Sequence, residues 1–451
     1  MRSVCLLFLC AAVLGAQSPL ADKISDELRK SGAPSVSVAV VTDGKLSFAQ
    51  AFGKADIANG RAADTSTRYA VGSISKQFTA AILLLLQEQG KLSLDDRVAK
   101  YFPDLTRANE ISIRELLSHT AGYEDFAPQD YTIPEWLKPT TPQATMDRWA
   151  KKPLNFDPGT RWQYSNTNYV IAGAIAEKAA GEPLMTMLRE HIFDPLQMKS
   201  AGDCLPIQPG DAIAYTRFAL GPPRPSQREA SGWYFAAGEL CMTPSDLARW
   251  DIAFLEKKIL SASSYQEFTR EVVLRNGDRT HYALGLMLRE LNDIPEITHG
   301  GEVSGFISSN AIFPTRDGAV VVLSNQDGMN LVQPLSNEIA RMTFLPAQVA
   351  GSDADIARVR GVVEGLEKAK IDRSLFTANA NFYFTETALA DIRNSLAPLG
   401  KLKSVTMAAE SLRGGMTFRV YRAAFARRTM ALSIYLTPEN KFEQFMVESL
   451  N

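Results

Sequence analysis

The most informative stretch of the chain reads Val71-Gly72-Ser73-Ile74-Ser75-Lys76-Gln77-Phe78. An apolar run follows and ends at Gly90, so the sequence predicts a helix over residues 75–89 with Ser73 at its N-terminus. Residues three apart share a helix face, so the Lys76 amine can reach the Ser73 hydroxyl. The positive end of the helix dipole disfavours an ammonium and favours an alkoxide there. Both effects favour loss of the serine proton, although a helix cap beside a solvated lysine also explains this motif taken alone.

Length and composition are those of a globular protein with more than one domain. The chain has 451 residues, of which 45% are hydrophobic and 22% are charged, and its formal net charge is -2. This charge gives no electrostatic attraction to nucleic acid or to an anionic membrane surface. We therefore expect a small-molecule or peptide substrate and no nucleic-acid partner. The oligomeric state is not specified by the sequence.

The N-terminus has the pattern of a secretory signal peptide. Arg2 precedes an apolar run over residues 4–14, and the small residues Gly15-Ala16 follow. We predict a signal peptide over residues 1–16 and an exported protein, either periplasmic or secreted. The apolar run is too short for a stable membrane span, so none is expected.

Loss of that segment leaves Cys204 and Cys241 as the cysteines of the mature chain. In an oxidising compartment the two can pair, and two buried free thiols fit the sequence equally well. The histidines are scattered without paired ligand spacing, so we expect no metal site and no cofactor. They are His119, His191, His281 and His299.

Strand signals at both ends of residues 20–345 predict a single antiparallel sheet. An Asp-Gly turn joins two early runs rich in β-branched residues, 35–41 and 45–52. The later strand signals lie at 284–289, 305–313 and 319–324. Helical signals lie between them at 112–118, 166–180 and 244–255. The predicted fold class is α+β, with an antiparallel sheet flanked by helices and a mainly helical subdomain.

A second, small α+β domain of unknown role is predicted over residues 352–451. Two helices, 352–370 and 386–397, precede four strand signals at 403–410, 416–425, 429–436 and 442–447. Two helices against a curled antiparallel sheet is the simplest packing. Side chains that alternate along these strands are expected to pack together rather than to line a pocket. They are Arg419, Tyr421, Phe425 and Tyr435.

A Tyr-x-Asn motif precedes the helix predicted at 166–180. In isolation, Tyr164 and Asn166 fit a buried tyrosine and a helix cap. A tyrosine held beside a cation such as Lys76 could instead have a lowered pKa and accept the serine proton. Tyr164 is therefore a candidate base.

His299-Gly300-Gly301 comes just before the strand predicted at 305–313. Taken alone, this triplet is more often a turn than a site. Its glycines let an extended backbone approach a ligand closely, so that the amides of Glu302 and Ser73 can point at a developing oxyanion.

The three motifs, in this order, resemble those of the serine β-lactamase and penicillin-binding-protein superfamily. More narrowly, the chain resembles the class C β-lactamase-related serine hydrolases, a branch that includes esterases, D-aminopeptidases and D,D-carboxypeptidases. Local matches at 90–96 and 116–122, and at Pro158-Gly159, support this. The resemblance covers roughly residues 22–345 and does not explain the C-terminal domain.

The resemblance implies a role for each motif. Ser73 would be the nucleophile, Lys76 the amine that accepts or relays its proton, and Tyr164 the base for acylation and for the deacylating water. The amides of Ser73 and Glu302 would form the oxyanion hole. Substrate would be bound by Asn166, His299, Gly300 and Gly301. His119 is expected to support a loop rather than to take part in chemistry.

Two residues depart from the superfamily pattern. His299 replaces a lysine, so a permanent cation becomes a group whose charge depends on pH. We therefore expect no efficient β-lactamase activity, and the resemblance to esterases and peptidases that carry histidine at this position implies one of those activities. Glu239 stands where related sequences usually have a glycine. Its carboxylate either lies near the rim of the cleft, where it could alter substrate choice, or faces solvent.

We therefore expect an exported serine hydrolase that acts through an acyl-enzyme on an ester or amide. D-amino-acid peptides and β-lactam-like compounds are candidate substrates. The alternative is a cell-wall or β-lactam sensor on the same scaffold, which is acylated with slow turnover or none. One group of aromatic residues fits pocket walls and core packing equally well. It comprises Tyr123, Phe126, Tyr131, Trp136, Trp233, Tyr234 and Phe235.

Overall fold

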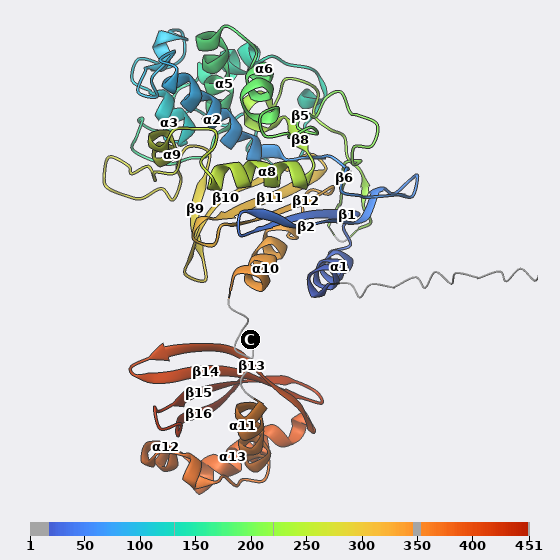
Figure 1. The fold of residues 1–451 in the computed structure, drawn as a ribbon, viewed down its shortest axis with the longest axis vertical. Coiled ribbons are helices and arrows are strands. Elements are labelled where there is room, and N and C mark those ends of the chain that lie inside the picture. The colour runs from blue at the N-terminus through green and yellow to red at the C-terminus, as the bar shows by residue number, and fades with distance from the viewer. Residues whose placement is uncertain (1–17, 130, 220, 346–352, 450–451) are drawn as a thin grey trace, which may run out of the picture. The chain divides into compact units, whose positions relative to one another are not determined.

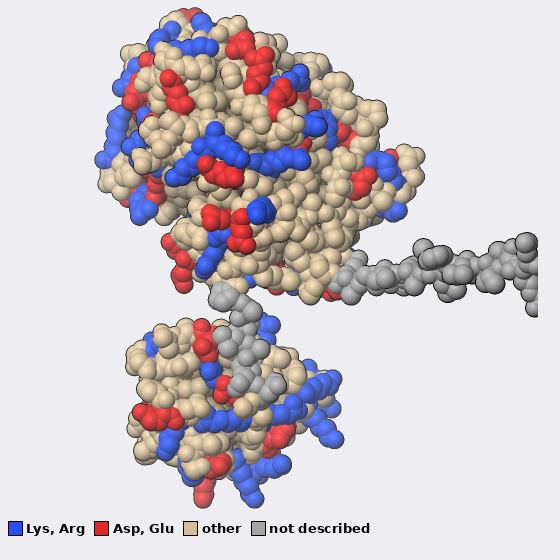
Figure 2. Space-filling view, viewed as in Figure 1, with Lys and Arg blue, Asp and Glu red and all other residues tan. Residues whose placement is uncertain are grey.

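The computed structural model describes residues 18–129, 131–219, 221–345 and 353–449 (Figure 1). The chain divides into two compact units, residues 1–344 and 345–451. The predicted signal peptide, residues 1–16, lies outside the described residues. Figure 2 shows basic and acidic side chains interspersed over the visible face of the first unit, in keeping with the net charge of -2.

A seven-stranded antiparallel sheet forms the centre of the first unit, which confirms the predicted fold class. The strand order is β3-β2-β1-β12-β11-β10-β9, so strands from the two ends of the unit lie side by side. Val38 of β1, for example, pairs with Val322 of β12. The strands are β1 (Ser35–Thr42), β2 (Lys45–Asp56), β3 (Arg61–Ala62), β9 (Met287–Leu291), β10 (Ile294–Val303), β11 (Phe306–Phe313) and β12 (Gly318–Ser324).

Strand β10 is absent from the sequence prediction, which places His299-Gly300-Gly301 before a strand rather than within one. In the structure the triplet belongs to β10, with His299 opposite Asn310 of β11. Paired glycines weaken the strand signal because they supply no side chain to pack. They are needed here because another segment approaches closely: a Cβ on Gly301 would lie 1.9 Å from the Val71 carbonyl oxygen.

Helices cover both faces of this sheet (Figure 1). On one face α8 (Pro244–Leu255) packs against β1 and β12, and on the other α10 (Val332–Phe344) packs against β11 and β12. The helix α1 (Pro19–Ser31) lies beside α10 and contacts β2. Strand β12 is therefore buried along its whole length, which explains its apolar sequence up to Leu323.

The helical subdomain is centred on α2 (Ser75–Glu88). Every residue of α2 over 75–84 is buried, because helices surround it on several sides. Its neighbours include α5 (Asn166–Ala180), α6 (Leu184–Leu188), α7 (Phe235–Gly238) and α9 (Ala262–Phe268). The short α3 (Ile113–Leu117) packs against α5. A helix buried this completely can hold a polar group away from water.

A disulfide between Cys204 and Cys241 settles the alternative that the sequence leaves open, with a sulfur–sulfur distance of 2.07 Å. Cys241 lies in β8 (Leu240–Met242), the middle strand of a small sheet with β4 (Tyr69–Ala70) and β5 (Gly202–Asp203). Because β4 directly precedes the Ser73 segment, the disulfide braces the chain leading into that segment.

The second unit is a four-stranded antiparallel sheet in the order β13-β14-β15-β16, with its helices on one face (Figure 1). Its elements are α11 (Asp353–Leu366), α12 (Ala378–Tyr383), α13 (Glu386–Leu396), β13 (Leu402–Arg413), β14 (Met416–Phe425), β15 (Thr429–Leu436) and β16 (Phe442–Ser449). The sequence analysis missed the short α12. Tyr421 and Phe425 are buried in the core, whereas Arg419 forms ion pairs with Asp355 and Glu410.

Candidate active site

Ser73 lies in η1 (Gly72–Ile74), a 3-10 turn that leads directly into α2. Gly72 has a φ of +52°, and a Cβ at this position would lie 2.9 Å from the Glu302 amide nitrogen of β10. Both the backbone conformation and the close approach of β10 therefore favour glycine. As a result, Ser73 stands at the N-terminus of α2, directly beside the strand that carries the glycine pair.

Lys76 is fully buried one helical turn after Ser73. Its Nζ donates to the Ser73 Oγ at 3.0 Å, the Asn166 Oδ1 at 2.7 Å and the Ala237 carbonyl oxygen at 2.9 Å. Burial lowers the pKa of Lys76 to about 7, and the Asp125 carboxylate partly opposes this shift. A substantial fraction of the amine is therefore unprotonated near neutral pH.

Tyr164 reaches the same serine from the other side. Its hydroxyl donates to the Ser73 Oγ at 2.7 Å, across 91 positions of sequence, and the Lys76 Nζ lies 4.8 Å from its ring centroid. The expectation of a lowered pKa is wrong, because burial raises the pKa of Tyr164 above its usual value. The hydrogen bond to Ser73 opposes this rise in pKa, and the Asp125 carboxylate adds to it.

Asn166 links Lys76 to a carboxylate that the sequence analysis did not identify. Its amide Nδ2 donates to the Asp125 Oδ1 at 3.2 Å, and its backbone N–H donates to the same oxygen at 2.9 Å. Its Oδ1 is thereby turned towards Lys76. Burial raises the pKa of Asp125, although these hydrogen bonds and Lys76 oppose the shift. No spacing pattern marks Asp125 in the sequence; only its position shortly after the 116–122 match could have suggested it.

His119 packs behind Tyr164, with 4.3 Å between the ring centroids. Its Nδ1 accepts the Ser165 backbone N–H at 3.2 Å, and Tyr169 and Tyr282 stack around its ring. Burial keeps the pKa of His119 well below its usual range, so the imidazole is neutral. These contacts are those expected of a residue that positions Tyr164.

His299 is buried behind the site and is neutral. Its Nδ1–H donates to the Gly300 carbonyl oxygen at 2.6 Å, which leaves Nε2 to accept the Tyr282 hydroxyl at 3.0 Å. Burial, assisted by the nearby Lys76, lowers the pKa of His299 to about 3. The expectation of a charge that varies with pH is therefore wrong over the physiological range.

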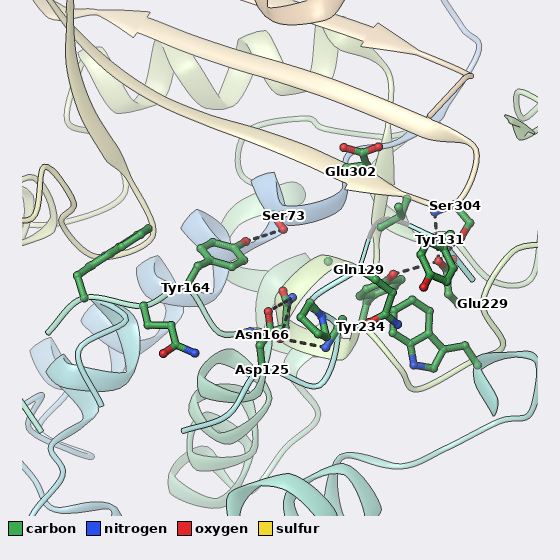
Figure 3. Close-up of a pocket in the computed structure, with 17 residues that line it drawn as sticks. Ser73, Asp125, Gln129, Tyr131, Tyr164, Asn166, Glu229, Tyr234, Glu302 and Ser304 are labelled. Atoms are coloured by element: carbon green, nitrogen blue, oxygen red, sulfur yellow. Dashed lines mark hydrogen bonds between the residues drawn. The ribbon is translucent and has the colours of Figure 1, made fainter. Parts of the chain in front are cut away.

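A cavity of about 570 Å³ opens over Ser73 (Figure 3). The aromatic residues that line it are Tyr131, Trp136, Trp162, Tyr164 and Tyr234. Asn166 and Glu302 also line it, whereas His299, Gly300 and Gly301 do not appear among the described residues of its wall. Of the other aromatics considered above, Tyr123, Phe126 and Trp233 are buried in the core. Phe235 packs against the core and lines a smaller neighbouring cavity, and Trp136 belongs to both the core and the wall of the Ser73 cavity.

A family model described as Beta-lactamase matches residues 20–340. The chain belongs to the beta-lactamase family. Its relatives include the putative penicillin-binding protein PbpX of Bacillus subtilis, 25% identical over 71% of this chain and 78% of that protein. A D-aminopeptidase of Brucella anthropi is 27% identical over 68% of this chain, which spans only 61% of that enzyme.

Solved structures of this family have the same fold. The octameric penicillin-binding protein homologue from Pyrococcus abyssi has a TM-score of 0.64 at 19% identity and covers 95% of this chain and 98% of its own. At that identity the likeness shows the fold alone, including most of the second unit. The D-amino acid amidase from Ochrobactrum anthropi SV3, complexed with L-phenylalanine amide, has a TM-score of 0.62 at 26% identity. It covers 72% of this chain and 97% of its own.

Glu239, the second departure from the family pattern, faces neither the main cavity nor open solvent. It lines a smaller neighbouring cavity together with Asp203. Burial, followed by repulsion from Asp203 and Glu177, raises the pKa of Glu239 to about 8. The side chain is therefore largely protonated at neutral pH and does not contact the Ser73 cavity.

Neither a metal cluster nor a membrane-spanning helix is found in the described part of the chain. No three histidine, cysteine, aspartate or glutamate side chains there are grouped so that they could hold a metal ion. No helix within the described ranges is both long enough and apolar enough to cross a bilayer.

Proposed function

We propose that this beta-lactamase-family protein is a serine hydrolase that acts through an acyl-enzyme on amides or esters. The observation that carries the proposal is the placement of the Ser73 Oγ, 3.0 Å from the Lys76 Nζ and 2.7 Å from the Tyr164 hydroxyl, at an open cavity. A nucleophile, an amine of lowered pKa and a hydroxyl donor within hydrogen-bond reach are the groups that acyl transfer needs. The relatives named as a D-aminopeptidase and a D-amino acid amidase support amides of amino acids as substrates.

In acylation, the neutral Lys76 amine accepts the Ser73 proton while the Oγ forms a bond to the substrate carbonyl carbon. The carbonyl electron pair moves onto oxygen, where the amides of Ser73 and Glu302 stabilise it. The Tyr164 hydroxyl then donates its proton to the leaving amine or alcohol as the scissile bond breaks. Lys76 returns its proton to Tyr164, which leaves the acyl-enzyme with both groups in their starting states.

Deacylation reverses these roles. Water attacks the ester carbon, and its proton passes to the neutral Lys76 amine as the carbon–oxygen bond forms. The bond to the Ser73 Oγ then breaks, and the proton returns to the serine, which releases a carboxylic acid. Asp125 and Asn166 hold the Lys76 amine in place throughout.

The predicted substrate-binding residues take different parts in this proposal. Asn166 lies on the cavity wall and would contact the substrate. His299, Gly300 and Gly301 lie behind the wall, so their part would be to hold β10 against η1 and thereby set the position of the Glu302 amide.

We also propose that the protein is exported. The signal-peptide pattern over residues 1–16 supports export. The disulfide between Cys204 and Cys241 also supports it, because such bonds persist mainly in oxidising compartments.

The test is turnover of three substrates, p-nitrophenyl butyrate, D-phenylalanine p-nitroanilide and nitrocefin, by the wild type and by Ser73→Ala. We expect the wild type to hydrolyse the ester or the anilide, and Ser73→Ala to lose at least about 1,000-fold in kcat/KM. Ser263→Ala, which changes an exposed serine of α9, is the matched control and should behave as the wild type. Equal turnover by the Ser73→Ala variant would refute the proposal. Stable acylation without turnover would identify a sensor instead.

A further inference from the structure

The cavity over Ser73 carries charge of one sign. Its charged residues, among those the structure describes, are Asp125, Glu229 and Glu302, and no lysine, arginine or histidine side chain lines it. Lys76 approaches Ser73 from the buried side, where its amine is surrounded by protein acceptors. A substrate that enters the cavity therefore meets carboxylates and no cationic side chain among the described residues of its wall.

Glu229 is built into this wall rather than extending freely from it. Only 8% of the residue is exposed. Its Oε1 accepts the Tyr234 hydroxyl at 3.0 Å, the Ser304 backbone N–H at 3.1 Å and the Ser304 hydroxyl at 2.5 Å. All of these bonds end on one oxygen. The carboxylate is thus fixed in orientation, and its Oε2 has no donor among the described residues.

Aromatic side chains accompany Glu229 on the same side of the cavity. Figure 3 shows Tyr131, Tyr234 and Ser304 around Glu229, with Ser73 and Tyr164 towards the other side. The faces of aromatic rings attract cations, and a carboxylate beside them adds a charged acceptor. Arg228 is absent from the described lining of the Ser73 cavity; it lines the smaller neighbouring cavity, which Glu229 also borders, and its guanidinium carbon lies 5.3 Å from the Phe306 ring centroid.

We infer that the cavity selects acyl groups that carry an ammonium group, and that Glu229 is the residue that binds this ammonium. The substrate class is then amides or esters of amino acids with a free amine, a refinement that rests on the proposed function. An anionic substrate such as a β-lactam carboxylate would meet repulsion from Asp125 and Glu229, with no compensating cation among the described residues of the wall.

A first test uses the wild-type protein alone. The kcat/KM values are compared for p-nitroanilides of D-phenylalanine, L-phenylalanine and 6-aminohexanoic acid, each with a free amine, an N-acetyl group or an N-succinyl group. For at least one acyl group we expect the ammonium form to exceed the N-acetyl form about tenfold, and the anionic N-succinyl form to be the poorest. No preference for the ammonium form in any of the three series would overturn the inference.

A second test assigns the preference to Glu229. Glu229→Gln removes the charge but keeps an acceptor oxygen for Tyr234 and Ser304, so the ratio of kcat/KM between the ammonium and N-acetyl forms should fall about tenfold. Glu296→Gln is the matched control, because Glu296 is a buried carboxylate of β10 outside the cavity lining, and its ratio should match the wild type. An unchanged ratio in Glu229→Gln would overturn the inference.

The two proposals fail in different ways. If p-nitrophenyl butyrate is hydrolysed through Ser73 but no preference for the ammonium substrates appears, the inference about Glu229 is wrong. The proposal that the protein is a serine hydrolase then still stands. If no ester or anilide is hydrolysed, the proposed function itself fails. A thermal unfolding curve for each variant shows whether a lost preference reflects a lost fold.

Discussion

The two units of this protein differ in what they bury. The first unit holds Lys76, His119, Asp251 and His299 with almost no exposed surface. Among residues 354–449 of the second unit, Ser433 is the only buried side chain that is not apolar or aromatic. Burying a titratable group is unfavourable unless hydrogen bonds compensate for the lost hydration. The second unit buries one such group among its described residues, the Tyr421 phenol, whereas the first unit buries lysine, histidine and aspartate side chains, and Lys76 lies beside a cavity. The first unit is therefore where we place the chemistry.

Lys76→Met should give the largest effect, because it removes the amine that we propose as the proton acceptor. We expect kcat/KM for p-nitrophenyl butyrate to fall by about 1,000-fold or more, in the range of a lost general base. Lys178→Met changes a lysine of α5 outside the cavity lining and serves as the control. Retention of more than a tenth of the activity by Lys76→Met would mean that this buried amine has no catalytic part.

Leu432→Ala tests the other side of the comparison. Leu432 is fully buried in the core of the second unit, so its truncation should lower the free energy of unfolding of that unit by about 2–5 kcal/mol. Turnover should change less than about twofold, since the proposed catalytic groups all lie in the first unit. Calorimetry and ester hydrolysis on the same sample check both expectations. A proportionate loss of activity at a temperature where the variant stays folded would contradict this separation.

Replacement of both Cys204 and Cys241 by serine should destabilise the first unit alone. The bond closes a loop with a sequence separation of 37 residues, and its loss should lower the free energy of unfolding by about 2–4 kcal/mol. The denaturant concentration at the midpoint of the second unit's unfolding transition should not change. Denaturant unfolding followed by fluorescence measures the loss, and an unchanged first transition would show that the disulfide does not brace this unit.

The dependence of kcat/KM on pH should be a smaller effect than those of the substitutions. Acylation needs the unprotonated amine, so kcat/KM should rise about tenfold per pH unit below the Lys76 pKa of about 7 and level off above it. His299, with a pKa of about 3, should add no step between pH 5 and pH 9. A profile that is flat from pH 5.5 to pH 8 would contradict the assignment of Lys76 as the proton acceptor.

Local signals in the sequence were sufficient for much of the fold. The helix at 166–180 and the strands at 416–425 and 429–436 have the predicted bounds, because each is delimited by strong turn residues or caps. Strand β10 was missed, since Gly300 and Gly301 depress the strand signal and their purpose, the close approach of Val71, comes from elsewhere in the chain.

Some residues of the candidate active site were predicted from their proximity in sequence, and others from the family resemblance. Ser73 and Lys76 are three residues apart, so helix geometry alone could bring them together. The Tyr-x-Asn motif made Tyr164 a candidate base, but its role beside Ser73 came from the resemblance, because no local pattern joins residues 91 positions apart. Asp125 and Glu229 were missed because their contacts are tertiary. The direction of the Tyr164 pKa shift was wrong for the same reason, since burial is set by the fold.

The central claim is that Ser73 is a nucleophile activated by Lys76 and Tyr164. It is tested most directly by intact-mass measurement after exposure to a fluorophosphonate, followed by peptide mapping. We predict one covalent adduct on Ser73 in the wild type, with labelling that slows sharply in Lys76→Met. A wild type that folds and remains unlabelled, or an adduct on another serine, would contradict the claim.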